Sequence, residues 1–162
     1  MKQNIKNVYI ISLVLIVVDQ FIKAVVSYKM GVYDTFALIK GFLDINLVHN
    51  TGAAFSLLQG GRIIFIMIAL IVIIGLTFYI KNQDYVDTRR TLVYGLLLGG
   101  IIGNLIDRII HGYVIDYISF TIFNYKFPVF NFADICIVLS LIGLVLLGFK
   151  EDLCKSTKLQ KK

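Results

Sequence analysis

Asp116 and Asp134 are the two residues of this sequence whose type and position suggest joint chemistry. Asp134 lies just inside a long apolar segment, and Asp116 lies between that segment and the one before it. In hydrocarbon an ionised side chain costs roughly 2.5–3.5 kcal/mol on membrane-insertion scales. Two carboxyl groups that share a proton cannot both ionise cheaply, so one stays protonated and the other is a carboxylate. The carboxylate can take a proton from water while the acid polarises a carbonyl oxygen. The pair predicts peptide hydrolysis without a covalent intermediate.

The composition indicates that these acids are positioned by a membrane protein. Of the 162 residues, 58% are hydrophobic and 16% are charged, and the mean hydropathy is +0.83. A soluble domain has about 25% charged residues. The net charge of +6 does not indicate nucleic-acid binding, because the basic residues flank apolar segments and form no basic groove with interleaved aromatic residues.

Four apolar segments are each close to the ~20 residues that cross a ~30 Å hydrocarbon core. They are residues 8–26, 63–80, 92–110 and 132–149. Such segments must be helical, because the bilayer offers their backbone no water to bond. We expect one domain, residues 1–162, that is an all-α integral membrane protein with four transmembrane helices and a small extracytoplasmic β-sheet and loop region. No small-residue cleavage site follows the first segment, so we expect it to remain as a helix.

The distribution of Lys and Arg predicts the orientation of the four helices. The side that carries both termini holds ten of them, and the opposite loops hold four. The ten are Lys2, Lys6, Lys81, Arg89, Arg90, Lys150, Lys155, Lys158, Lys161 and Lys162, and the four are Lys29, Lys40, Arg62 and Lys126. The excess places both termini in the cytoplasm. Residues 150–162 are then a cytoplasmic tail, and the loops at about 27–62 and 111–131 face outward.

The outward loops contain patterns typical of strands. Residues 42–47 alternate in polarity, with Leu43, Ile45 and Leu47 on one face. The second loop has extended pieces at residues 113–118 and 125–130. We expect a small sheet that lies on the membrane surface, close to the two aspartates.

Several polar residues accompany the two acids inside or beside the apolar segments. Asn131, three residues before Asp134, is placed to cap the fourth helix. Asn104 and Arg108 lie on one helix face, with Gly100 a turn earlier. Taken singly, each acid could instead be an interfacial anchor, and the face of Asn104 could be a packing seam. Only the polar residues taken together can distinguish a catalytic site from these structural roles.

Asp19 and Lys23 stand four residues apart in the first segment, in the favourable order for an ion pair. They could support the acid pair, or they could neutralise each other while Lys23 extends outward to the interface. Residues 49–56, with turn-forming Gly52, follow the predicted strand and suit a loop over a substrate. His49 and His111 have no partner at metal-binding spacing, so no metal site is expected.

Five motifs carry a resemblance to a known family. They are Asp19-Gln20-x-x-Lys23, Asn50-x-Gly52-Ala53-Ala54-Phe55, Gly100-x-x-Gly103-Asn104-x-x-Asp107-Arg108, Gly112-x-Val114-x-Asp116 and Phe130-Asn131-x-Ala133-Asp134. In this order the set resembles the bacterial lipoprotein signal peptidases, also called signal peptidase II or aspartic peptidase family A8. The family often has Phe after the first catalytic Asp, where this chain has Tyr117, and the change could alter the hydrogen bonding near Asp116.

The resemblance implies an aspartic endopeptidase of the bacterial cell membrane with its active site near the outer face. Such an enzyme cuts the signal peptide from a prolipoprotein just before a cysteine that carries diacylglycerol. Asp116 and Asp134 would be catalytic. The implied substrate-binding or supporting residues are Asn50, Gly52, Gly100, Asn104, Arg108, Val114, Asn131, Ala133, Asp19 and Lys23. We also expect a monomer that contacts membrane lipids, needs no cofactor or metal, and is inhibited by globomycin.

Two other functions are compatible with the sequence. A small proton- or ion-coupled transporter would use its acids as a relay across the membrane. The segment 63–80 carries no charge, which disfavours such a path. A non-catalytic membrane assembly factor would use the polar residues as interaction anchors.

Overall fold

The computed structural model describes residues 2–52, 59–83 and 86–159, which form a helical bundle with a small sheet. The helices are α1 (Lys2–Lys29), α2 (Arg62–Lys81), α3 (Thr88–Ile110) and α4 (Phe132–Leu159). The strands are β1 (Thr35–Ile39), β2 (Leu43–Asn50), β3 (Val114–Ile122) and β4 (Tyr125–Lys126).

Four helices of the described chain are long and apolar enough to cross a membrane. The candidate spans are Asn4–Lys29, Arg62–Lys81, Thr88–Ile110 and Phe132–Lys150. Each predicted apolar segment lies within one of them. The expected class, a four-helix membrane protein with a small sheet, is confirmed.

The end of α4 differs from the prediction. The helix continues to Leu159, through most of the segment 150–162 that the sequence predicts to be a tail. The residues beyond the apolar span include Lys, Glu and Leu, which are good helix formers. The helix can therefore continue past the apolar residues.

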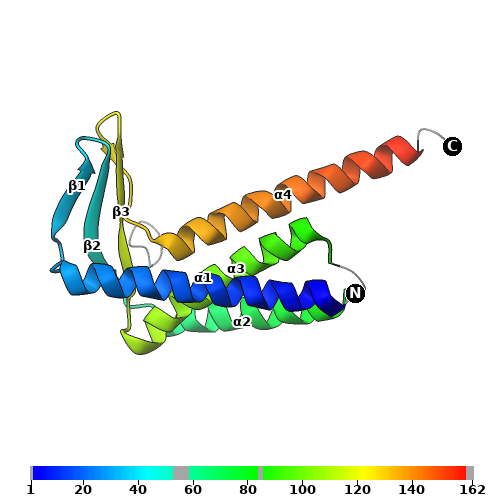
Figure 1. Cartoon of the computed structure of the whole chain (residues 1–162), viewed down its shortest axis with the longest axis horizontal. Helices are drawn as coiled ribbons and strands as arrows, with labels where there is room; N and C mark the ends of the chain where they lie inside the picture. Colours follow the sequence, from blue (N-terminus) through cyan, green and yellow to red (C-terminus); the bar gives the residue numbers. More distant parts are fainter. Residues whose placement is uncertain (1, 53–58, 84–85, 160–162) are drawn as a thin grey trace.

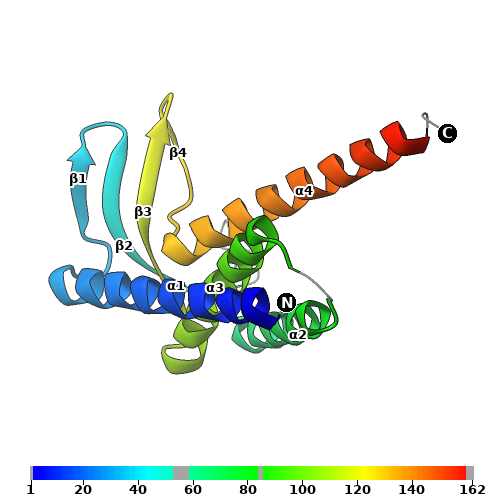
Figure 2. The same cartoon turned by 45° about the vertical axis from the view of Figure 1, so that its right-hand side comes forward.

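Helix α3 is the centre of the bundle and packs against α1, α2 and α4. Most of its span is buried inside the protein, whereas less than a fifth of each of the other three spans is buried. The sheet stands at one end of the helices, and the start of α1 and the described end of α4 lie at the opposite end (Figure 1). The C-terminal part of α4 leans away from the other helices (Figures 1 and 2).

Glycines allow α3 to approach its neighbours closely. A methyl carbon added at Gly103 would lie 2.6 Å from the Asp19 carboxylate oxygen of α1, and one at Gly100 would lie 2.5 Å from the Ala133 carbonyl oxygen of α4. Small residues at such positions let membrane helices pack backbone to backbone. The close approach brings polar side chains of α1, α3 and α4 within hydrogen-bonding distance of one another.

The sheet has the order β1-β2-β3-β4 and is antiparallel throughout. Leu47 of β2 and Ile115 and Tyr117 of β3 form a buried cluster, against which Ile22 and Val26 of α1 pack. The alternation in residues 42–47 predicts that one face of the strand is buried. Leu47, on that face, is buried in the structure. This packing fixes β3 beside the start of α4, where the site lies.

Candidate active site

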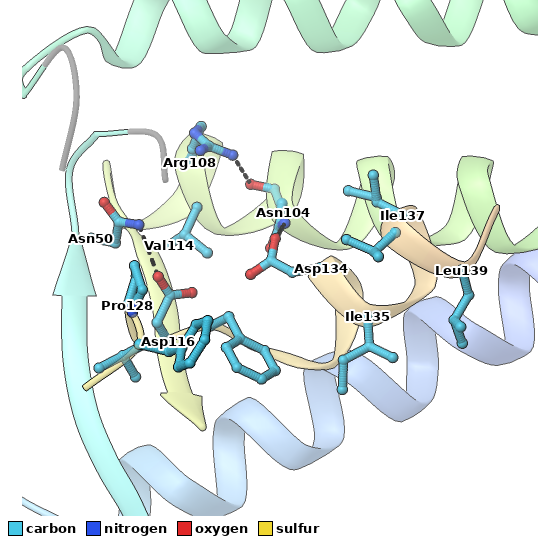
Figure 3. Close-up of a pocket in the computed structure, with 14 residues that line it drawn as sticks. Asn50, Asn104, Arg108, Val114, Asp116, Pro128, Asp134, Ile135, Ile137 and Leu139 are labelled. Carbon is cyan, nitrogen blue, oxygen red and sulfur yellow. Dashed lines mark hydrogen bonds between the residues drawn. The ribbon is translucent and has the colours of Figure 1, made fainter. Parts of the chain in front are cut away.

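Asp116 and Asp134, hereafter the acid pair, line one cavity at the sheet end of the helices. Asp116 lies on β3 and Asp134 in the first turn of α4. The cavity has a volume of about 540 Å³, and the two carboxyl groups point toward each other within it (Figure 3). The structure brings together the two acids that the sequence predicts to meet.

Asp116 is held by two side-chain amides. Asn50, at the end of β2, donates from Nδ2 to Asp116 Oδ2 at 2.8 Å (Figure 3). Asn131 donates from Nδ2 to Asp116 Oδ1 at 2.7 Å. The Asn50 amide is oriented by Gly52, whose backbone N–H donates to Asn50 Oδ1 at 2.9 Å. Gly52 thus acts on the acid pair through Asn50.

Asp134 is held by the capping of α4. The Asn131 side chain accepts from the Asp134 backbone N–H at 2.9 Å, and the Asp134 carboxylate accepts from the Asn131 backbone N–H at 3.1 Å. This reciprocal pattern is a capping box, which satisfies two N–H groups that a helix start leaves free. The predicted cap is confirmed, and the fully buried Asn131 contacts both members of the acid pair.

Asn104 of α3 connects the acid pair to the interior of the bundle. Its Nδ2 donates to Asp134 Oδ1 at 2.7 Å. Its Oδ1 accepts from Asn131 Nδ2 at 3.1 Å and from Lys23 Nζ at 3.0 Å. Because both donors require an oxygen at this position, they fix the Asn104 amide so that its NH₂ group faces Asp134.

Lys23 lies in the bundle interior, where its side chain is 1% exposed. Its ammonium is 2.8 Å from an Asp19 carboxylate oxygen and 2.9 Å from one of Asp107. The alternative in which Lys23 extends outward to the interface is wrong. The carboxylate of Asp107 on α3 supplies a second counter-charge, which the spacing within α1 alone could not reveal.

Asp19 also reaches the start of α4. Its Oδ1 accepts from the Ala133 backbone N–H at 3.0 Å. Ala133 is 1% exposed and lies against Gly100 and Gly103 of α3. Ala133 and Gly100 therefore act through close packing, which sets the position of the first turn that carries Asp134.

Asp107 and Gln20 are structural partners that the sequence prediction omits from the site. Asp107 is fully buried and accepts from Gln20 Nε2 at 3.0 Å and from the Ile115 backbone N–H at 3.1 Å. The bond to Ile115 attaches the start of β3, and so Asp116, to α3. An acid inside an apolar segment is itself a signal of function or of a buried partner, and Asp107 meets that criterion.

Arg108 contacts the loop that follows β2. Its Nη2 donates to the Gly52 carbonyl oxygen at 3.3 Å, and its guanidinium lies 5.0 Å from the centre of the Phe65 ring. Its Nη1 is 3.4 Å from the Asn104 carbonyl oxygen of the same helix (Figure 3). Arg108 and the buried Val114 both line the cavity beside the acid pair. The predicted loop positions Ala53, Ala54, Phe55 and Ser56 lie outside the described residues.

The hydroxyl of Tyr117 makes a hydrogen bond that the Phe expected at this position could not make. The hydroxyl oxygen accepts from the Phe132 backbone N–H of α4 at 3.2 Å. Phe132 is the first residue of α4, so Tyr117 satisfies another N–H group that the helix start leaves free. The ring is 4% exposed, and burial raises the pKa of the Tyr117 hydroxyl.

The electrostatics of the site favour a shared proton. Burial, and then the nearby charge of Asp134, raise the pKa of Asp116 to about 7. Hydrogen bonds from Asn50 and Asn131 act in the opposite direction but are weaker. Asp116 therefore holds its proton to a higher pH than an ordinary carboxyl does, and a retained proton is what acid–base chemistry by a carboxyl pair requires.

The comparisons with known proteins agree with this geometry. Residues 11–150 match the sequence profile of the family described as signal peptidase (SPase) II. A lipoprotein signal peptidase from Halothermothrix orenii is 42% identical over 149 residues, covering 90% of this chain and 97% of that protein. One from Symbiobacterium thermophilum is 38% identical over 138 residues, covering 85% of this chain and 90% of that protein.

A solved structure gives the same result for the fold. It is described as a bacterial membrane enzyme and is 31% identical, with a TM-score of 0.83 over 90% of this chain and 88% of its own. The sequence match and the fold match each extend over most of the chain. The transporter and the assembly factor are thereby set aside, and the chain belongs to the signal peptidase II family of aspartic peptidases.

Proposed function

We propose that this protein removes the signal peptide from prolipoproteins by cutting just before a cysteine that carries diacylglycerol. The relatives named as lipoprotein signal peptidases support this substrate class. The observation that carries the proposal is the acid pair, whose carboxyl groups face each other in one cavity at the sheet end of the helices. A lipid-bearing substrate would reach this cavity from within the bilayer.

In the proposed reaction the acid pair holds one proton. The ionised carboxyl takes a proton from a water molecule, whose oxygen then attacks the scissile carbonyl carbon. The protonated carboxyl donates to the carbonyl oxygen as negative charge develops there. Collapse of the tetrahedral intermediate breaks the C–N bond, and a proton passes from the pair to the departing amine.

The amides around the acid pair are positioning residues in this mechanism. Asn50, Asn131 and Asn104 each donate to a carboxylate oxygen at 2.7–2.8 Å. Such bonds limit rotation of the carboxyls, and they favour the ionised form of the group that receives them. Lys23 orients Asn104 by a hydrogen bond to its side-chain oxygen, and Asp19 accepts a hydrogen bond from the first turn of α4.

The cavity also has an apolar wall that suits a membrane substrate. Ile135, Val138 and Leu139 of α4 line it, and Val138 and Leu139 are about half exposed. We assign this wall to the apolar part of the signal peptide or to the acyl chains, with membrane lipids as neighbours. We expect the protein to act as a monomer and to be inhibited by globomycin.

We place both termini in the cytoplasm and the cavity near the outer face of the membrane. The ten-to-four distribution of Lys and Arg supports this orientation. The start of α1 and the described end of α4 lie at one end of the bundle and the sheet at the other (Figure 1). One orientation of the bundle is therefore compatible with cytoplasmic termini and with a cavity near the outer face.

The test is cleavage of a purified diacylglyceryl prolipoprotein by the purified protein in detergent or lipid. The expected product begins with the modified cysteine, as read by mass spectrometry. The same prolipoprotein with an unmodified cysteine is the matched control and should stay intact, and globomycin should block cleavage. Intact modified substrate after incubation with folded protein would refute the proposal.

A further inference from the structure

A second, smaller cavity adjoins the acid pair. It has a volume of about 170 Å³, and its lining includes Val48, Thr51 and Gln59. Asn50, Asp116, Pro128 and Val129 line both this cavity and the larger one. Asp116 therefore stands at the wall between two spaces, and a peptide bond held at its carboxyl has room on either side.

The two cavities differ in chemistry and in size. The larger follows the apolar residues of α4 within a candidate membrane span. The smaller is lined by residues 48–51 at the end of β2 and by Gln59, all outside the candidate spans. Thr51 and Gln59 bring a hydroxyl and an amide. Ligand cavities are usually about 300–1,000 Å³. The larger falls in this range, whereas the smaller suits a single residue.

We propose that the smaller cavity binds the residue that follows the lipid-carrying cysteine of the substrate. The proposal rests on the function given above. A prolipoprotein passes from an apolar signal peptide to a water-exposed mature chain at the cut site, so its two halves need different surroundings. The apolar cavity fits the half before the cut, and the cavity outside the spans fits the half after it.

The lining predicts which side chains this cavity accepts. The hydroxyl and amide groups of Asn50, Thr51 and Gln59 offer both donors and acceptors, and the imidazole of His49 lies in the same lining. These groups suit a small or uncharged polar side chain. The cavity thus favours a residue of this kind after the cysteine.

Val48 is the residue through which the proposal can be tested. It is paired with Asp116 in the register of β2 and β3. Directly opposed residues of antiparallel strands place their side chains on the same face of the sheet, so Val48 faces the cavity side. Val48 lines the smaller cavity, whereas Val138 lines the larger one, which makes Val138 a matched control.

The experiment compares two diacylglyceryl prolipoproteins that differ only in the residue after the modified cysteine, Gly in one and Gln in the other. Val48→Phe fills the smaller cavity, so it should lower the Gln-to-Gly ratio of kcat/KM at least about tenfold, as expected for steric exclusion from a pocket. Val48→Ala enlarges the cavity and should raise the ratio. Val138→Phe should reduce cleavage of both substrates by the same factor.

Equal losses for both substrates with Val48→Phe, or an unchanged ratio in both Val48 variants, would overturn the assignment. If Val48→Phe fails to fold, Val48→Ala decides the question alone. The wild-type protein separates this result from the proposed function. Failure to cleave the Gly substrate refutes the function, whereas cleavage with a ratio insensitive to Val48 refutes only the role of the cavity.

Discussion

Replacement of Lys23 by Met tests whether the buried ion cluster holds the bundle together. The Lys23 ammonium is 2.8 Å from Asp19, 2.9 Å from Asp107 and 3.0 Å from Asn104 Oδ1. Both carboxylates are nine-tenths or more buried, and Met has a similar shape without a charge. The variant leaves two buried carboxylates without their shared cation.

Removal of one partner from a buried ion pair costs about 3–5 kcal/mol. At about 2–4 °C per kcal/mol for a chain of this size, the Tm of Lys23→Met should fall by about 6–20 °C. The measurement is thermal unfolding of the purified protein in detergent. Adding Asp107→Asn to Lys23→Met replaces one of the two uncompensated carboxylates by a neutral amide. This double variant should therefore be more stable than Lys23→Met alone.

A partly exposed ion pair provides the control. Arg90 and Asp87 approach to 3.4 Å with about a third of each side chain exposed, and surface pairs are worth about 0–1 kcal/mol. Arg90→Met should therefore change the Tm far less than Lys23→Met. A Tm of Lys23→Met equal to that of the wild type, or a double variant less stable than the single one, would refute the reasoning.

Three further predictions follow from contacts around the acid pair. Asn131→Ala removes the helix cap and the bond to Asp116, so stability should fall by at least about 1 kcal/mol and kcat should fall with it; unchanged unfolding and unchanged turnover would contradict the capping role. Gly103→Ala places a methyl carbon 2.6 Å from the Asp19 oxygen and should destabilise the protein by about 1–3 kcal/mol, which urea unfolding measures against Gly148→Ala, where the added carbon has nothing within 4 Å; equal losses would contradict it. Activity should decline above about pH 7, because burial and Asp134 raise the pKa of Asp116 to about 7 and the required proton is lost as pH rises; the decline should persist in His49→Asn, and a rate that keeps rising above pH 8 would contradict the assignment.

Local features of the site could be predicted from the sequence because they depend on neighbours along the chain. The spacing of Asn131 and Asp134 gave the helix cap, and the spacing of Asp19 and Lys23 gave their ion pair. The meeting of Asp116 and Asp134 at one end of the helices followed from the ends of the apolar segments. These inferences need only helix periodicity and the thickness of the bilayer.

Contacts between elements could not be predicted in the same way. Whether Lys23 faces the interior depends on how α1 docks on α3, and only that docking brings Asp107 to it. The bond from Phe132 to the Tyr117 hydroxyl depends on where β3 meets the start of α4. The extension of α4 to Leu159 reflects helix propensity beyond the apolar span, which a hydropathy pattern does not detect.

The acid pair is tested most directly by the cleavage rates of Asp116→Asn and Asp134→Asn on a diacylglyceryl prolipoprotein. Asp44→Asn, which changes a carboxylate six residues before Asn50 in the same sheet, is the matched control. Each acid-pair variant should lose at least about 10²-fold in kcat, as expected when a general acid or base is removed, while its abundance and unfolding stay near those of the control. Cleavage at the wild-type rate by either variant would contradict the account.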